Sequence, residues 1–174
     1  MIFTWADVLS AEPRFAENVE RRFEMYPSHV LATFRKDRSP RVTGLEVHFL
    51  LGELWLGMAH NSLKARDLAR DPRFAVQANP GAGDARADGD VRIAGRAVEV
   101  TERRLRTRYV DAVRPPLPFQ LFRVDVAEIV QTEIEGDDLV LRSWRPGRPL
   151  HTVRRGTEGA VPPGNLRMGD AAAC

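Results

Sequence analysis

Residues 40–73 constrain the fold most, because short β-prone runs alternate there with tight turns before a single short helix begins. Arg41–Phe49 changes its apolar phase across Gly44, which indicates a β-bulge or a site where another group approaches the backbone closely. The turn Leu51-Gly52 then leads into Glu53–Met58. Together with the preceding run His29–Arg35, these segments predict three strands in an antiparallel meander.

The remaining chain continues this mixture of strands and short helices. A helix over Ser62–Arg70 follows the meander and ends at Asp71-Pro72, and another covers Glu12–Tyr26, with Ser10 as its N-cap and Pro27 after it. A third helix runs from Thr101 to about Val113. The other expected strands are Arg73–Ala78, Val91–Val100 with an interruption at Gly95, and the hairpin Phe119–Glu133 with Asp138–Trp144.

This order of elements predicts an α+β fold in which one antiparallel sheet curls into a small barrel. Closure of the sheet removes exposed strand edges. A length of 174 residues suits one domain, which we place at residues 1–154. From residue 155 onward the chain is rich in Gly, Pro and Ala and poor in large apolar residues, so we expect residues 155–174 to form a loose C-terminal tail.

Composition excludes several classes of function. The net charge is only +2, and basic residues mostly alternate with acidic ones, so we expect no nucleic-acid partner. No apolar run approaches the roughly 20 residues that cross a bilayer, and the N-terminus lacks the pattern of a signal peptide, so we expect no membrane partner. Cys174 is the only cysteine and precludes an internal disulfide, which favours a cytoplasmic location. The four histidines show no metal-ligand spacing.

The start of the helix Ser62–Arg70 is a candidate anion site. Free N–H groups and the positive end of the helix dipole favour an anion there, and Ser62 and Lys64 add a hydroxyl and an ammonium to the same turn. Lys64 is one of only two lysines in the chain; the other is Lys36. The alternative is an ordinary surface helix, with Ser62 or Asn61 as its N-cap and Lys64 in solvent.

The run HNSLKARDL followed by RDPRF resembles the pyridoxamine 5'-phosphate oxidase-like, flavin-binding split-barrel superfamily. The resemblance covers about Phe23 to Arg154. It implies an antiparallel split β-barrel of about six to seven strands with a few short helices, homodimeric, with cofactor sites at the interface. In this family the Ser-x-Lys pattern contacts the flavin phosphate, a role that falls here on Ser62 and Lys64.

The same resemblance implies further cofactor contacts. Arg41, Val42 and Thr43 match a strand that runs beside the flavin, although for Arg41 and Thr43 an ordinary sheet position is an equal or better interpretation. A second set, which consists of Met58, Ala59 and His60, matches the strand end and loop beside the cofactor. Met58 departs from the Ser or Thr that is frequent in the family at this position.

Two further candidates lie later in the chain. Arg92 belongs to a strand of the family's Val-Arg pattern, where Asp90 replaces a frequent Gln, and a cross-strand ion pair is its alternative role. Trp144 matches a C-terminal Trp/Arg region near the partner's cofactor, and anchoring of the last strand is the alternative.

The resemblance implies an FMN-dependent oxidoreductase that carries out two-electron chemistry on a small organic substrate. The chain ends RPGRPLHTVRR and lacks the Arg-x-His motif of true pyridoxamine phosphate oxidases, so we do not predict vitamin B6 synthesis. Hydride transfer to or from a flavin needs no catalytic acid or base, and none is predicted. The alternatives are an F420-dependent reductase of the same fold and a non-catalytic flavin- or haem-binding protein.

Overall fold

The computed structural model describes residues 2–81 and 89–156. The strands of its single sheet are β1 (His29–Phe34), β2 (Pro40–Leu45), β3 (Val47–Leu50), β4 (Glu53–Ala59), β5 (Arg73–Gln77), β6 (Asp90–Glu99), β7 (Phe119–Glu135), β8 (Asp138–Trp144) and β9 (His151–Gly156). The helices of the described residues are α1 (Trp5–Ala11), α2 (Pro13–Glu24), α3 (Leu63–Arg70) and α5 (Arg103–Val113).

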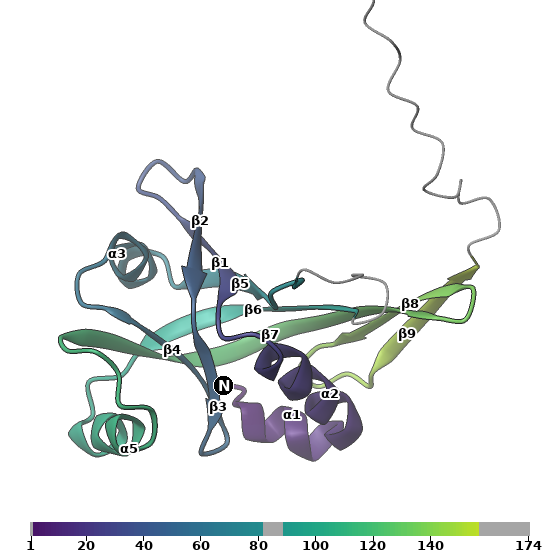
Figure 1. The fold of residues 1–174 in the computed structure, drawn as a ribbon, viewed down its shortest axis with the longest axis horizontal. Coiled ribbons are helices and arrows are strands. Elements are labelled where there is room, and N and C mark those ends of the chain that lie inside the picture. Colours follow the sequence, from purple (N-terminus) through teal and green to yellow (C-terminus); the bar gives the residue numbers. More distant parts are fainter. Residues whose placement is uncertain (1, 82–88, 157–174) are drawn as a thin grey trace, which may run out of the picture.

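The sheet confirms the predicted α+β class and its antiparallel pairing. Its hydrogen-bonded path runs β2-β1-β5-β6-β7-β4-β3, and β8 and β9 continue from β7. Figure 1 shows β8 and β9 extending away from the end of the molecule that carries α3 and α5. The sheet has nine strands in the described residues, against the six to seven expected, because one predicted strand is divided and β9 was not foreseen.

The predicted strand Arg41–Phe49 is the one that is divided. It breaks at Glu46 into β2, which pairs with β1, and β3, which pairs with β4. The expected meander is therefore wrong, and two separate hairpins take its place. These two strands lie at opposite ends of the hydrogen-bonded path although one residue separates them in the chain, and in the described residues the path does not close.

The N-terminal helices correct a second expectation. Ser10 is not an N-cap, because it lies inside α1, and the N-cap of α2 is Glu12. In α1, Trp5 is buried, and its ring lies 4.6 Å from that of Phe49 on β3. Both helices cover the sheet, α1 against β4 and α2 against β6 (Figure 1).

Gly95 marks the predicted interruption in β6. The pairing register of β6 with β7 shifts between Ala94 and Gly95, and a Cβ on Gly95 would lie 2.2 Å from the carbonyl oxygen of Asp125. Only glycine fits so close an approach, so the bulge fixes how β6 bends against β7.

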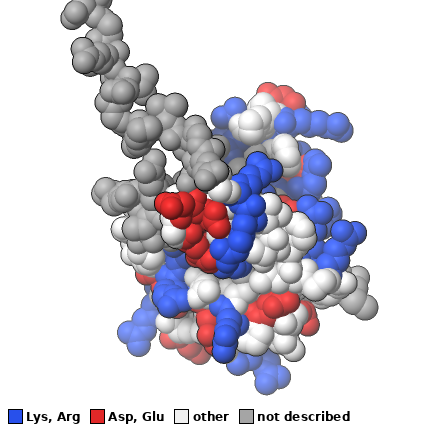
Figure 2. Space-filling model, turned by 90° about the vertical axis from the view of Figure 1, so that its right-hand side faces the viewer, with Lys and Arg blue, Asp and Glu red and all other residues white. Residues whose placement is uncertain are grey.

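Two apolar clusters hold the fold together. The larger joins α1 and α2 to the sheet, and the smaller lies beneath α5 around Trp55, Tyr109 and Phe119. The C-terminal strands add ion pairs at the surface, including those of Arg142 and Arg154 with Glu135. Figure 2 shows basic and acidic side chains interleaved on this side of the molecule, without a single basic patch.

The predicted domain boundary falls inside β9, since Arg155 and Gly156 still belong to that strand. Residues 157–174, the rest of the expected tail, lie outside the described residues. In the described part of the chain, no helix is long and apolar enough to cross a membrane.

Candidate functional site

The start of α3 places Ser62 at the capping position, the role that its alternative interpretation gives it. Ser62 is the N-cap, and its hydroxyl accepts a hydrogen bond of 3.3 Å from the amide of Ala65. The first intrahelical bond runs from the amide of Arg66 to the carbonyl of Ser62. The amides of Leu63 and Lys64 therefore have no acceptor within the helix, and they leave two donors at its positive end.

Lys64 connects this helix start to β2. Its ammonium donates a hydrogen bond to the carbonyl oxygen of Gly44, and burial lowers its pKa. The side chain is therefore not simply in solvent, which was the alternative interpretation. A charged ammonium has three donors, so it can donate one hydrogen bond to this carbonyl and still bind an anion.

A second connection between α3 and the sheet centres on Asp67, whose carboxylate is buried. Arg41 on β2 donates its Nε to Asp67 at 2.6 Å, and Arg70 donates an Nη at 2.8 Å. Thr33 on β1 donates its hydroxyl at 3.1 Å. Burial opposes ionisation, but the hydrogen bonds from these three side chains hold the pKa of Asp67 below its usual range.

A groove with a volume of about 750 Å³ opens beside the start of α3. It is lined by residues 44–46, 57–59 and 113–119 together with Ser28, His48, Lys64 and Tyr109. Such a volume lies in the range of about 300–1,000 Å³ that is usual for cofactor sites. Three predicted site residues, Met58, Ala59 and Lys64, line this groove.

The other predicted residues on β2 and before α3, including Ser62, do not line this groove. Arg41 is bound to Asp67, and Thr43 has a buried hydroxyl with no hydrogen-bond partner among the described residues. Val42 is 66% exposed and therefore lies on the opposite face of the strand from Arg41 and Thr43. The exposed His60 precedes α3, and its amide donates to the carbonyl of Pro118 at 3.2 Å.

Two predicted residues have partners elsewhere in the chain. Arg92 on β6 donates to Glu128 at 3.2 Å, which is the cross-strand ion pair named as its alternative role. Trp144 is 2% exposed and packs in the larger core cluster. Neither residue lines the groove.

The groove also contains a polar pair that sequence reasoning missed. The hydroxyl of Tyr109 on α5 lies 3.1 Å from Nδ1 of His48 on β3. Burial lowers the pKa of His48 and, together with the nearby Glu46 carboxylate, raises that of Tyr109 to about 12. Both side chains are therefore neutral at pH 7, so the pair can donate or accept a hydrogen bond without carrying charge.

One sequence signal pointed toward this pair. Gly57 interrupts the apolar strand β4, and a Cβ there would lie 2.5 Å from the hydroxyl of Tyr109. A glycine in a strand interior indicates a close approach, but the sequence does not say by which group. His48 carries no such signal, because a single histidine in a strand is common.

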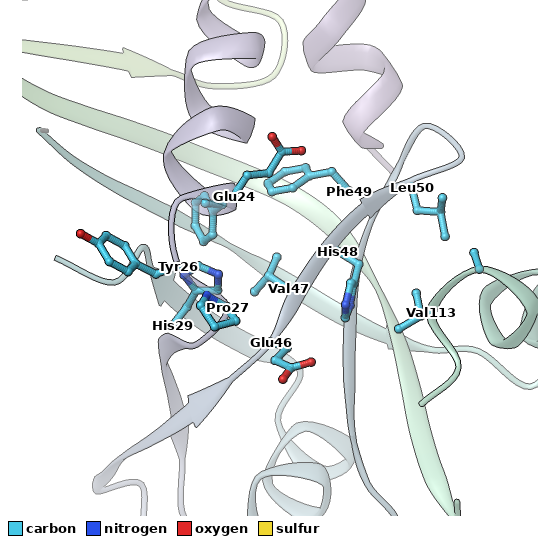
Figure 3. Close-up of a pocket in the computed structure, with 12 residues that line it drawn as sticks. Glu24, Tyr26, Pro27, His29, Glu46, Val47, His48, Phe49, Leu50 and Val113 are labelled. Carbon is cyan, nitrogen blue, oxygen red and sulfur yellow. The ribbon is translucent and has the colours of Figure 1, made fainter. Parts of the chain in front are cut away.

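A smaller side hollow of about 420 Å³ lies along β3 and shares Glu46, His48 and Val113 with the groove. It is lined by residues 23–24, 26–27, 29, 46–50 and 112–113. Figure 3 shows Val47 and His48 projecting to opposite sides of β3, with Val113 on the His48 side. The imidazole of His48 therefore lies on the side of β3 that faces α5.

His29 lies at the opposite side of the side hollow and is buried. Its Nδ1 accepts a hydrogen bond of 3.2 Å from the amide of Asn79. Burial, followed by the charge of Arg22 and the proximity of His48, lowers its pKa to about 4. His29 is therefore neutral and accepts a hydrogen bond within the fold. It does not line the groove, so it is not positioned to act there as an acid or base.

Comparison with known proteins identifies the fold. No curated protein matches the sequence. Among solved structures, PhzG from Burkholderia lata 383 is 14% identical, with a TM-score of 0.56 and with 90% of this chain and 98% of PhzG covered. A conserved hypothetical protein from Mycobacterium tuberculosis is 22% identical, with a TM-score of 0.53 and coverage of 82% and 91%.

A heme binding protein from Mycobacterium smegmatis is also 22% identical and has a TM-score of 0.53, with 81% of this chain and 58% of that protein covered. At these identities the likeness establishes the fold alone. A family model described as pyridoxamine 5'-phosphate oxidase matches residues 15–133, which include most of α2, the whole groove and most of β7. Because this match spans more than half of the 174 residues, the chain belongs to the pyridoxamine 5'-phosphate oxidase family.

Proposed function

We propose that this protein binds FMN in the groove and is a flavin-dependent oxidoreductase that acts on a small organic substrate. The observation that carries the proposal is the start of α3, which Ser62 caps and where Lys64 binds β2 and lines a groove large enough for a flavin. A helix start with two unpaired amides and an ammonium suits the phosphate of FMN. The apolar lining from Pro115 to Phe119 suits a planar ring.

Each part of the site has a distinct role in this proposal. The amides of Leu63 and Lys64 and the Lys64 ammonium bind the phosphate, while Met58 and Ala59 border the ring. The backbone of residues 42–44, of which Gly44 lines the groove, would border the edge of the ring. Bound FMN supplies the two-electron chemistry, and the protein orients it and excludes water. Arg92 and Trp144 are left out of this site because neither lines the groove and both have partners elsewhere in the chain.

We further propose that the protein is a homodimer with the groove at the interface. Large apolar side chains are exposed near the groove and on the outer face of β2, among them Val42 at 66% and Leu117 at 77%. A second copy of the chain that covers them would also enclose the cofactor. Light scattering coupled to gel filtration should then give twice the mass of one chain.

The chain offers a matched pair of variants to test cofactor binding. We expect FMN to bind the purified protein with micromolar or better affinity in a fluorescence titration, with F420 titrated in parallel. Lys64→Ala should weaken FMN binding about tenfold or more, since one charge-assisted hydrogen bond contributes roughly 1.5–3 kcal/mol. Lys36→Ala removes the only other lysine, which is exposed in the turn between β1 and β2, and should leave binding unchanged.

The outcome also separates the alternatives. Preferential binding of F420, weakened by Lys64→Ala, would identify a deazaflavin-dependent reductase. Failure of both cofactors to bind would overturn the oxidoreductase proposal. PhzG, a structural neighbour, was solved with tetrahydrophenazine-1-carboxylic acid, a small organic molecule of the general class we propose as substrate.

A second candidate function is non-catalytic haem binding. It is favoured by His48, a neutral imidazole that lines the groove, because neutral imidazole is a common ligand of haem iron. The neighbour from Mycobacterium smegmatis is described as a heme binding protein. Titration with haemin should give a shifted Soret band that is lost in His48→Ala if this function is correct.

A further inference from the structure

The side chain of Asp67 connects α3 to two strands of the sheet. Its buried carboxylate accepts hydrogen bonds from β1, β2 and α3 through Thr33, Arg41 and Arg70. Arg70 additionally donates to the carbonyl of Phe34, the last residue of β1. These contacts fix the helix to the strand pair that borders the proposed phosphate site.

Two connections hold α3 along β2. Lys64 reaches Gly44, and three residues later Asp67 reaches Arg41, which lies three residues before Gly44. Residues three apart lie on one helix face, so both contacts leave α3 from the side that faces the strand.

We propose that Asp67 is a positioning residue for the cofactor phosphate, because it holds Arg41 and the start of α3 in place around the anion site. This inference rests on the proposed function. The contact to Asp67 uses the Nε of Arg41, so the two Nη groups of the guanidinium are not part of it. Asp67 therefore orients Arg41 without occupying its outer donors.

A simple electrostatic role would have the opposite effect. The carboxylate places a negative charge near the site, so its removal alone should strengthen the binding of a phosphate. A positioning role predicts that its removal weakens binding, because Arg41 and α3 lose their fixed places. The direction of the change therefore separates the two roles.

The experiment compares FMN with riboflavin, which lacks the phosphate, on wild type and Asp67→Asn. We expect Asp67→Asn to weaken FMN binding about tenfold, while riboflavin affinity changes less than about twofold. A general loosening of the fold would weaken both ligands alike. Asp71→Asn is the matched control, because Asp71 at the end of the same helix pairs only with the exposed Arg73 among the contacts described, and it should change neither affinity.

Two further variants protect the test against misfolding and against indirect effects. Thr33→Val removes only one of the three hydrogen bonds and should weaken FMN binding by about threefold at nearly unchanged shape. In an Arg41→Ala background, Asp67→Asn should weaken FMN binding less than it does in wild type, because Asp67 acts partly through Arg41.

Each outcome decides the inference. Tighter FMN binding by Asp67→Asn, or an unchanged preference for FMN over riboflavin in both Asp67→Asn and Thr33→Val, would overturn it. If wild-type protein binds neither flavin, the proposed function fails instead, and that result is distinguishable because it appears before any variant is measured.

Discussion

Replacement of Gly57 by alanine should destabilise this protein more than a one-carbon change in a strand normally does. An added Cβ would lie 2.5 Å from the Tyr109 hydroxyl and 3.3 Å from its Cζ. The ring of Tyr109 has little room to retreat. It is 1% exposed and lies 5.9 Å from the ring of Trp55 and 6.0 Å from that of Phe119.

The magnitude follows from two terms. Overpacking of a filled core costs about 1–3 kcal/mol. If the ring moves, the hydrogen bond between Tyr109 and His48 is lost as well, at about 0.5–1.5 kcal/mol. We therefore expect Gly57→Ala to lower the free energy of unfolding by roughly 2–4 kcal/mol. For a chain of this length, that corresponds to a fall of about 5–15 °C in Tm.

Urea denaturation followed by tryptophan fluorescence measures this change, and Tyr109→Phe supplies the control. Removal of the hydroxyl leaves Cζ as the nearest atom at 3.3 Å, a contact that a shift of a few tenths of an ångström relieves. In that background Gly57→Ala should cost less than about 1 kcal/mol. A Gly57→Ala protein as stable as wild type, or a cost that Tyr109→Phe does not reduce, would refute the close packing described for this site.

Two other buried groups give predictions of a different kind. His29 has a pKa of about 4 in the folded protein against about 6.5 in the unfolded chain, so protonation favours unfolding. As pH falls from 6.5 to 4, the free energy of unfolding of wild type should fall by about 3 kcal/mol relative to that of His29→Gln. Urea denaturation at several pH values measures this, and a difference between the two proteins that stays constant with pH would contradict it. Arg22 is buried and donates to the carbonyls of Asn79 and Gly89 at 2.7 and 3.1 Å. Arg22→Lys keeps the charge but loses the fork geometry, so it should lower the free energy of unfolding by roughly 2 kcal/mol. An unchanged urea midpoint would exclude this role.

Local sequence signals predicted the elements whose boundaries depend on local chemistry. Ser62 was expected at the start of α3 and is its N-cap, because a hydroxyl there satisfies an amide of the first turn wherever the helix packs. Asp138–Trp144 was expected as a strand and is β8. Gly95 was expected to interrupt β6 and does so, since the close approach leaves no space for a side chain.

The failures have non-local causes. The helix α1 has only seven residues and is held by the burial of Trp5 against Phe49, a contact that no short window of sequence contains. β9 pairs with β8 along an exposed face, so its residues lack the apolar alternation that marks a half-buried strand. In both cases the partner, and not the segment, determines the structure.

The sequence also could not show which side chains pair across the fold. It placed both Lys64 and Arg41 near one anion, but it did not predict that Asp67 binds Arg41. Asp67 lies on a helix that reads as amphipathic, and an aspartate there is normally exposed. Asp67 is buried because α3 packs against β1 and β2, a long-range contact that the helix sequence does not show.

The groove itself arises from one non-local feature, the passage of the chain from β2 to β3. These strands lie at opposite ends of the hydrogen-bonded path, so Glu46, the single residue between them, spans the opening where the sheet does not close. The groove and the side hollow both border this residue. A continuous strand over residues 41–49 would have paired with one neighbour throughout and left no such opening. The break at Glu46 therefore opens the space of the groove, and the flanking residues Gly44 and His48 line it because the strand ends between them.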